Sequence, residues 1–151
     1  MNQILLVLAM LSIGVVYGTD MFHALVVKKA ATLSSDQAIA DLMGHTHLVA
    51  DKRMPIIGAS GLISSLLLTV LNFNASLGIY SGIAVLALLA HLAIYSRVAK
   101  PINAQLSAAA IAKQTPAHTR VLQQCWDSVI VYRAMLLGLA MMAMIIGAIC
   151  S

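Results

Sequence analysis

The hydrophobic residues of the chain fall into four long runs, separated by shorter and more polar segments. A helix needs about 20 mainly apolar residues to cross a lipid bilayer. Four stretches meet this requirement: residues 4–27, 55–73, 77–95 and 129–149. Pro55 stands in the first turn of the second stretch, where proline is tolerated. Only three residues separate the second stretch from the third, so these two form an antiparallel hairpin. The pattern predicts an all-α fold, a four-transmembrane-helix bundle.

The two longer connecting segments also carry helical signals. Ser34 and Gln37 have the spacing of a capping box, and the residues that follow place an apolar stripe at helical spacing. We therefore predict an additional amphipathic helix over residues 35–53, on the inner leaflet or across the mouth of the bundle. In the other segment, a Thr-Pro step at residues 115–116 favours a helix start. The fourth helix then gains a cytoplasmic extension over about residues 116–128.

The positions of the charged residues predict the orientation of the bundle. Apart from Arg133, every basic residue lies in one of the two longer connecting segments: Lys28, Lys29, Lys52, Arg53, Arg97, Lys100, Lys113 and Arg120. Basic loops stay on the cytoplasmic side of a membrane. Both long loops are thus expected in the cytoplasm and both termini outside, in a bacterial inner membrane. The acidic residues lie on or near the same side: Asp20, Asp36, Asp41, Asp51 and Asp127.

The composition agrees with a single integral membrane domain over residues 1–151. Hydrophobic residues make up 61% of the chain and charged residues only 9%, whereas a soluble domain carries roughly a quarter of charged residues. The excess apolar surface is expected to face the lipid bilayer. A soluble enzyme, a nucleic-acid-binding module and a disulfide-stapled secreted domain are disfavoured, and no nucleic-acid partner is expected despite the net charge of +4. Association of the chain into a homo-oligomer is left open.

Three ionisable residues within the apolar runs are the candidate catalytic residues. Asp20 and His23 are three residues apart and share a face of the first helix, and Arg133 lies in the fourth run. A charge inside a membrane helix costs at least about 2.5 kcal/mol unless it is paired or hydrated. We therefore predict that Asp20 pairs with His23 or with Arg133 inside the bundle. The alternative is that these side chains reach back to the lipid headgroups.

Further candidates lie at a similar depth and are predicted to bind a substrate. Trp126 is seven residues before Arg133 and shares its helix face, while His91 and Tyr95 lie one turn apart at the end of the third run. His23, His47 and His91 are the ligands expected if a metal or haem is present; whether any cofactor is bound is left open. His47 shares a face with Asp51, and His45 with Asp41, and we expect at least one of these to be a plain surface pair.

The residues after the third run resemble a known family. Pro101-Ile102-Asn103, followed by Trp126 and then Arg133, is similar to the Pro-x-Asn and Trp…Arg pattern of the anthrone-oxygenase-like family. These are small four-span membrane proteins, mostly catalogued as a domain of unknown function. The resemblance implies an oxygenase-type oxidation of an activated aromatic carbanion by molecular oxygen, and it assigns Asn103, Trp126 and Arg133 to the site. The family often has a His between the Trp and the Arg, where this chain has Ile130, so His23 or His91 would supply the imidazole.

These observations combine into one functional hypothesis with two alternatives. His23, oriented by Asp20, removes an acidic C–H proton. Arg133 and Asn103 stabilise the enolate oxygen, and Trp126 stacks on a flat ring. The protein is then a membrane oxidoreductase or oxygenase acting on a lipophilic aromatic or quinone-like molecule. The first alternative is a non-catalytic assembly or scaffold subunit. The second, which the sequence favours less, is a proton-coupled carrier of small molecules.

Overall fold

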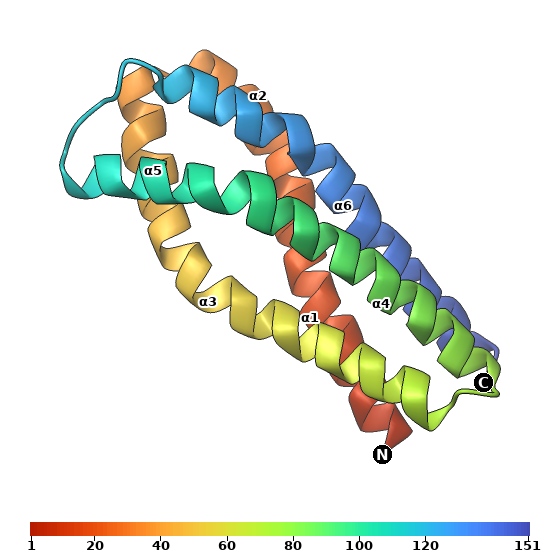
Figure 1. Ribbon diagram of the computed structural model, residues 1–151. Helices are drawn as coiled ribbons and strands as arrows, with labels where there is room; N and C mark the ends of the chain where they lie inside the picture. The colour runs from red at the N-terminus through yellow and green to blue at the C-terminus, as the bar shows by residue number, and fades with distance from the viewer.

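The computed structural model describes all of residues 1–151 and consists of helices and short connections, without a β-strand (Figure 1). The helices are α1 (Asn2–Phe22), α2 (Lys28–Leu33), α3 (Asp36–Leu71), α4 (Ser76–Ile94), α5 (Lys100–Ile111) and α6 (Thr119–Ile149). Two π-helical turns join helices without a break, namely η1 (His23–Val27) between α1 and α2, and η2 (Tyr95–Ala99) between α4 and α5. The chain therefore forms four long helical rods.

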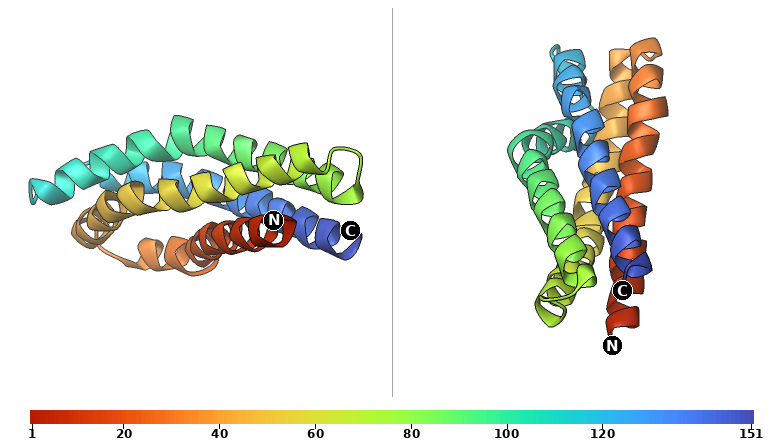
Figure 2. Two further views of the ribbon diagram at one scale, coloured as in Figure 1. Left: turned by 90° about the horizontal axis from the view of Figure 1, so that it is seen from below. Right: turned by 90° about the vertical axis from the view of Figure 1, so that its right-hand side faces the viewer.

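All four rods are long and apolar enough to cross a membrane. They lie in a ring in which α1 is beside α3 and α6, and α4 is beside α3 and α6. Both termini and the α3–α4 turn lie at one end of the molecule (Figure 2). We call this end the turn end. The α2–α3 and α5–α6 connections lie at the other end, which we call the loop end.

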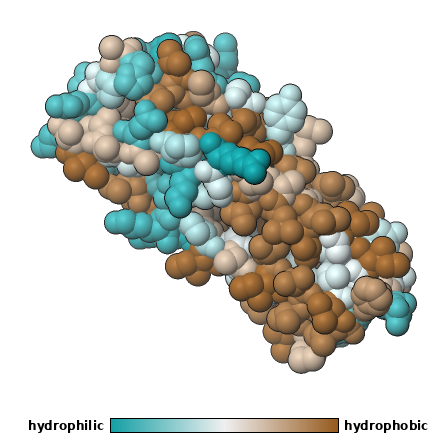
Figure 3. Space-filling view, in the orientation of Figure 1, coloured by the Kyte–Doolittle hydropathy of each residue, from teal (hydrophilic) through white to brown (hydrophobic).

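The rods are longer than a membrane is thick. The 36 residues of α3 extend over about 54 Å, whereas the hydrocarbon core of a bilayer measures about 30 Å. In α3 the charged residues all precede Met54, and residues 54–71 carry none. Polar residues accordingly gather at the loop end of the surface and apolar residues cover the turn end (Figure 3).

Two separate hydrophobic cores hold the rods together. The turn-end core consists of Ala9, Ile13, Val16, Leu68, Leu77, Ala84, Ala87, Leu88, Leu137, Ala140, Ala143 and Met144. The loop-end core consists of Ala31, Ile39, Met43, Ala99, Ile102, Leu106, Trp126 and Ile130. Both cores follow from the same sequence pattern, namely apolar residues at helical spacing. Such residues form one face of each rod, and the faces of neighbouring rods bury one another.

The separate amphipathic helix predicted over residues 35–53 is the first half of α3, which runs on through Pro55. Proline removes one backbone hydrogen bond from a helix interior and favours a break. Here the helix is buried against its neighbours on both sides of the proline, at Met43 and at Gly61, so tertiary packing keeps the helix continuous. The cap also differs from the prediction, since Oγ of Ser35 accepts the bond from the Ala38 amide at 3.2 Å.

The other rods also extend beyond the predicted runs. The third continues through η2 and α5 to Ile111, a stretch for which we predicted no helix. The predicted extension of the fourth rod is present from Thr119, with His118 at the cap position in place of the Thr-Pro step. The π turns begin at His23 and Tyr95. Such turns shift the register of a helix and are frequent at functional sites, and both of these residues line the cavity described next.

Candidate functional site

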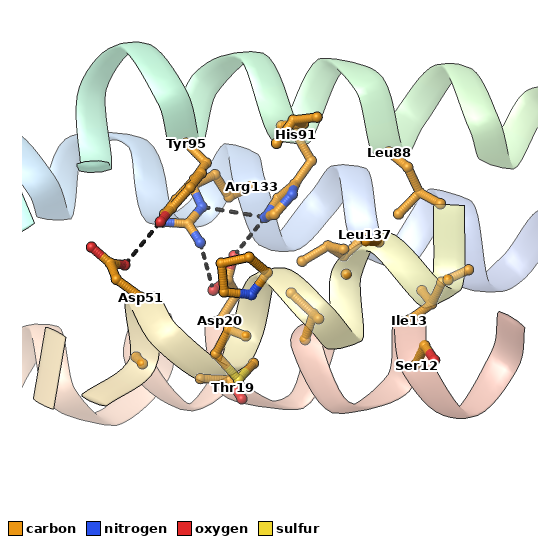
Figure 4. Close-up of a pocket in the computed structure, with 18 of the residues that line it drawn as sticks. Ser12, Ile13, Thr19, Asp20, Asp51, Leu88, His91, Tyr95, Arg133 and Leu137 are labelled. Carbon is orange, nitrogen blue, oxygen red and sulfur yellow. Dashed lines mark hydrogen bonds and ion pairs between the residues drawn. The ribbon is translucent and has the colours of Figure 1, made fainter. Parts of the chain in front are cut away.

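A cavity of about 250 Å³ lies inside the ring, between the turn-end and loop-end cores (Figure 4). All four rods contribute to its lining. Its loop-end half is polar and contains Asp20, His23, His47, Asp51, His91, Tyr95, Asn103, Trp126 and Arg133. Its turn-end half is mostly apolar and includes Ile13, Val16, Leu62, Leu88 and Leu137. Every predicted catalytic and substrate-binding residue is therefore in one cavity.

Asp20 and Arg133 form a buried ion pair across α1 and α6. Nη2 of Arg133 donates to Oδ1 of Asp20 at 3.1 Å, and the two side chains are only 8% and 5% exposed. This geometry confirms one of the two predicted pairings and excludes the headgroup-facing alternative. Nη1 of Arg133 makes no hydrogen bond to the protein, so the guanidinium keeps a donor for a ligand.

His91 on α4 completes a triangle with this ion pair (Figure 4). Its Nε2 lies 3.3 Å from Oδ2 of Asp20 and 3.4 Å from Nε of Arg133. A protonated Nε2 donates to Asp20, and an unprotonated Nε2 accepts from Arg133. The position of one proton therefore decides which neighbour His91 bonds.

A second network, a chain of hydrogen bonds between side chains, lies at the loop end of the cavity. Oδ1 of Asp51 accepts hydrogen bonds from the Tyr95 hydroxyl and from Nδ2 of Asn103, both at 2.9 Å. Oδ1 of Asn103 in turn accepts from Nε1 of Trp126 at 2.9 Å. This chain fixes the Tyr95 and Trp126 rings, and the Arg133 guanidinium carbon lies 5.7 Å and 5.5 Å from their centres. Both distances allow cation–π attraction.

This second chain shows how Asn103 is held. Its Nδ2 donates to Asp51 and its Oδ1 accepts from Trp126, so Asn103 positions Trp126. The expectation from the resemblance that Asn103 also stabilises a substrate oxygen stays a prediction. Asp51 was missed as a site residue, because it directly precedes Lys52 and Arg53 and such a run is typical of a solvated helix surface. Its shared face with His47 was the available signal.

His23 is oriented differently from the prediction. Its Nδ1 lies 3.0 Å from the backbone oxygen of Thr19, and Asp20 bonds His91 and Arg133 instead. A carbonyl oxygen only accepts hydrogen bonds, so the bonded Nδ1 carries the proton and Nε2 keeps a free lone pair. The His23 ring lies beside Trp126, with 5.2 Å between the ring centres. His23 thus has the tautomer of a general base, although a backbone carbonyl rather than Asp20 sets it.

His47 packs near Trp126, with 5.3 Å between the ring centres. The residue is 3% exposed, and its Nε2 is buried without a hydrogen-bond partner. It belongs to the first half of α3, before the uncharged stretch that begins at Met54. Burial lowers the pKa of this imidazole to about 4, against a raising effect of Asp51 and further lowering by His23 and Arg133. His47 is therefore neutral at physiological pH.

The three histidines named as metal ligands do not form a metal centre. No group of three His, Cys, Asp or Glu side chains is arranged to hold a metal ion. His23 and His47 both pack near Trp126, and His91 bonds the ion pair. His23, His47 and His91 line one cavity but are not arranged as three ligands of one metal ion, because equal depth along three helices does not bring the ring nitrogens to one point.

The remaining acid–histidine pair lies on the surface, as predicted. Nδ1 of His45 lies 3.3 Å from the Asp41 carboxylate, and the side chains are 55% and 73% exposed. It also lies 2.8 Å from the Asp41 backbone oxygen. His45 therefore has the same type of local bond as His23 but lies outside the cavity, which makes it a natural control.

No known protein family, no curated protein and no solved structure matches this chain. The similarity to the anthrone-oxygenase-like family therefore stays a prediction that rests on the residues quoted for it. The functional argument depends on the cavity itself.

Proposed function

We propose that the protein is an integral membrane oxidoreductase of the oxygenase type, which binds a lipophilic aromatic or quinone-like molecule in the cavity between its four rods. The loop end lies in the cytoplasm of a bacterial cell and both termini lie outside its inner membrane. This orientation is supported by the basic residues, which gather at the loop end. The cavity then lies at the depth of the cytoplasmic leaflet.

A single arrangement carries the enzymatic proposal. The free Nε2 of His23, the free Nη1 of Arg133 and the ring of Trp126 belong to one largely apolar cavity. A base, an oxyanion donor and a flat stacking surface are the groups that proton abstraction next to a carbonyl requires. Two carboxylates, Asp20 and Asp51, accompany one guanidinium, so the cavity favours a neutral ligand over an anion.

The proposed reaction converts an activated methylene group to a carbonyl: R₂CH₂ + O₂ → R₂C=O + H₂O. Nε2 of His23 takes the C–H proton, and the enolate oxygen of the carbanion accepts from Nη1 of Arg133. The carbanion carbon bonds O₂, and the imidazolium of His23 returns the proton to give a hydroperoxide. Loss of water from the hydroperoxide leaves the carbonyl. The imidazolium balances the negative charge while the anion exists.

The size of the cavity limits the ring system. An apolar cavity of about 150 Å³ holds one benzene ring, so about 250 Å³ corresponds to roughly one to two rings. A suitable probe is 1-naphthol, whose keto form carries a methylene group para to its carbonyl. Its oxidation by one O₂ yields 1,4-naphthoquinone and water.

The experiment compares the wild-type protein with His23→Gln and His45→Gln in proteoliposomes containing 1-naphthol. We expect oxygen uptake and quinone formation, with one ¹⁸O atom entering the product from ¹⁸O₂. His23→Gln removes the base and lowers the rate by about 10²- to 10⁴-fold. His45→Gln, which removes an equivalent side chain from the surface, leaves the rate unchanged.

Two outcomes contradict the proposal in different ways. If the wild-type protein does not oxidise 1-naphthol, the oxygenase function fails and a non-catalytic assembly subunit is favoured. If His23→Gln and His45→Gln have equal rates, the protein oxidises its substrate without His23 as the base.

A further inference from the structure

The cavity reaches the protein surface between α3 and α4. Pro55 and Ala59 of α3 and Leu92 of α4 line the cavity and are also exposed, Leu92 to 46%. Pro55 and Ala59 are four residues apart and so lie on one edge of α3. The opposite edge faces α1, where Gly61 contacts Ile13. The three exposed residues, Pro55, Ala59 and Leu92, are called the side opening below.

A glycine of α3 leaves free space beside the side opening. Gly58 lies between Pro55 and Ala59 and lines the cavity, and a Cβ atom added to it would meet nothing within 4 Å. The space next to α3 is therefore unfilled at this point, whereas an added Cβ at Gly61 would contact α1.

The side opening lies at the depth of acyl chains in the proposed membrane orientation. Arg53 of α3 and Arg97 of η2 are both exposed and mark the level of the cytoplasmic headgroups. Ala59 is six residues beyond Arg53, or about 9 Å further along the helix, and Leu92 is five residues before Arg97, or about 7.5 Å. Proline, alanine and leucine side chains at this depth form an apolar opening toward lipid.

We propose that the ligand is a one- or two-ring hydroxy- or ketoarene with an aliphatic tail, which is taken from the bilayer through the side opening and keeps its tail there when bound. This inference rests on the proposed function for the position of the ring beside Trp126 and Arg133. The cavity is large enough for the ring system but not for a long tail. The tail would therefore extend through the apolar side opening into the lipid. The ligand class is therefore membrane-dissolved, as for a prenylated quinone or quinol.

Trp126 provides a direct readout of ring binding, because it is the only tryptophan of the chain and lines the cavity. Quinones quench indole fluorescence on contact. Two probes are titrated into proteoliposomes, namely 1,4-naphthoquinone and the same ring with a prenyl tail. The variant Ala59→Phe/Leu92→Phe narrows the side opening. The control Ile56→Phe/Ala93→Phe places the same rings on exposed positions of the same helices outside the cavity.

We expect the narrowed opening to raise the apparent Kd of the tailed quinone, measured by quenching, by about tenfold or more. The reason is that several methylene groups of the tail are no longer buried in the side opening. Quenching by the tailless quinone should change less than about twofold, since the ring site is untouched, and the control should match the wild type. Equal losses for both probes, or a loss in neither, overturns the side opening. If neither probe quenches Trp126 in the wild type, the ring site itself is absent and the proposed function fails with it.

Discussion

The two halves of α3 differ in how closely they approach their neighbours. The first half packs tightly against α5, and the second half borders the cavity. In its first half Gly44 lies directly against α5, and an added Cβ would clash with the Leu106 backbone and come within 2.6 Å of Ala110. Ser107 also donates to the Gly44 backbone oxygen at 3.1 Å. In its second half Gly58 borders the cavity and touches nothing. The same residue type thus brings two helices together in one place and leaves space for a ligand in another.

The difference follows from what surrounds each glycine. Around Gly44 the neighbours are apolar, or bond across the contact as Ser107 does, so the two helices pack closely here. Around Gly58 the rods carry Asp20, Asp51 and Arg133, whose charges must be paired before they are buried. The Asp20–Arg133 pair and the hydrogen bonds of Asp51 satisfy these groups, and the cavity lies beside them.

Removal of one charge from the cavity should have the largest effect. Arg133→Leu leaves the carboxylate of Asp20 buried without its partner, and loss of one partner of a buried ion pair costs about 3–5 kcal/mol. The double variant Asp20→Leu/Arg133→Leu removes both charges and should recover most of this free energy of unfolding. Denaturation of both variants in detergent measures the difference. A double variant as unstable as the single one would contradict a paired role for the two charges.

The two glycines give a smaller and opposite pair of effects. Gly44→Ala overpacks the α3–α5 contact and should destabilise the protein by about 1–3 kcal/mol. Gly58→Ala adds a methyl group to open space and should stabilise it by about 0.5–1 kcal/mol, because alanine favours helix more than glycine. Melting temperatures of the two variants test this contrast. Equal destabilisation by both substitutions would show that the cavity closes.

Acid sensitivity tests the burial of His47 beside the cavity. The unfolded chain binds a proton at His47 below about pH 6.5, whereas the folded protein does so only near pH 4. The stability linked to His47 is thus fully present above pH 6.5 and is lost as the pH falls toward 4. His47→Phe should lose less stability between pH 7 and pH 5 than the wild type. His118→Phe, on an exposed residue, serves as the control and should follow the wild type.

A surface pair on the exposed face of the first half of α3 should have the smallest effect. Asp41→Asn removes the carboxylate beside His45, where both side chains are largely exposed. Pairs of this kind contribute about 0.5 kcal/mol or less, so the melting temperature should scarcely move. A loss comparable with that of Arg133→Leu would mean that this end of α3 is covered in the native protein.

The sequence by itself determined the helical class and the pairing of the second and third helical runs. Four apolar runs predict four long helices, and a three-residue connection between the second and third runs leaves only a hairpin. The cost of a lone charge in an apolar run was enough to predict that Asp20 pairs inside the bundle, with His23 and Arg133 as the candidate partners. These conclusions depend on local composition and spacing, which the chain carries without any tertiary information.

Only the tertiary structure decided where helices continue and which polar groups meet. Packing on both sides of Pro55 overcomes the local preference for a break. The π turns at His23 and Tyr95 rotate side chains in a way that a regular helical period does not predict. Asp51, His91 and Asn103 find their partners on other helices, across 44 to 71 residues of chain. A rotation of one helix about its own axis would change these hydrogen-bond partners completely. The hydrophobic pattern of the sequence is compatible with several such rotations, so the packing of the rods decides which polar groups meet.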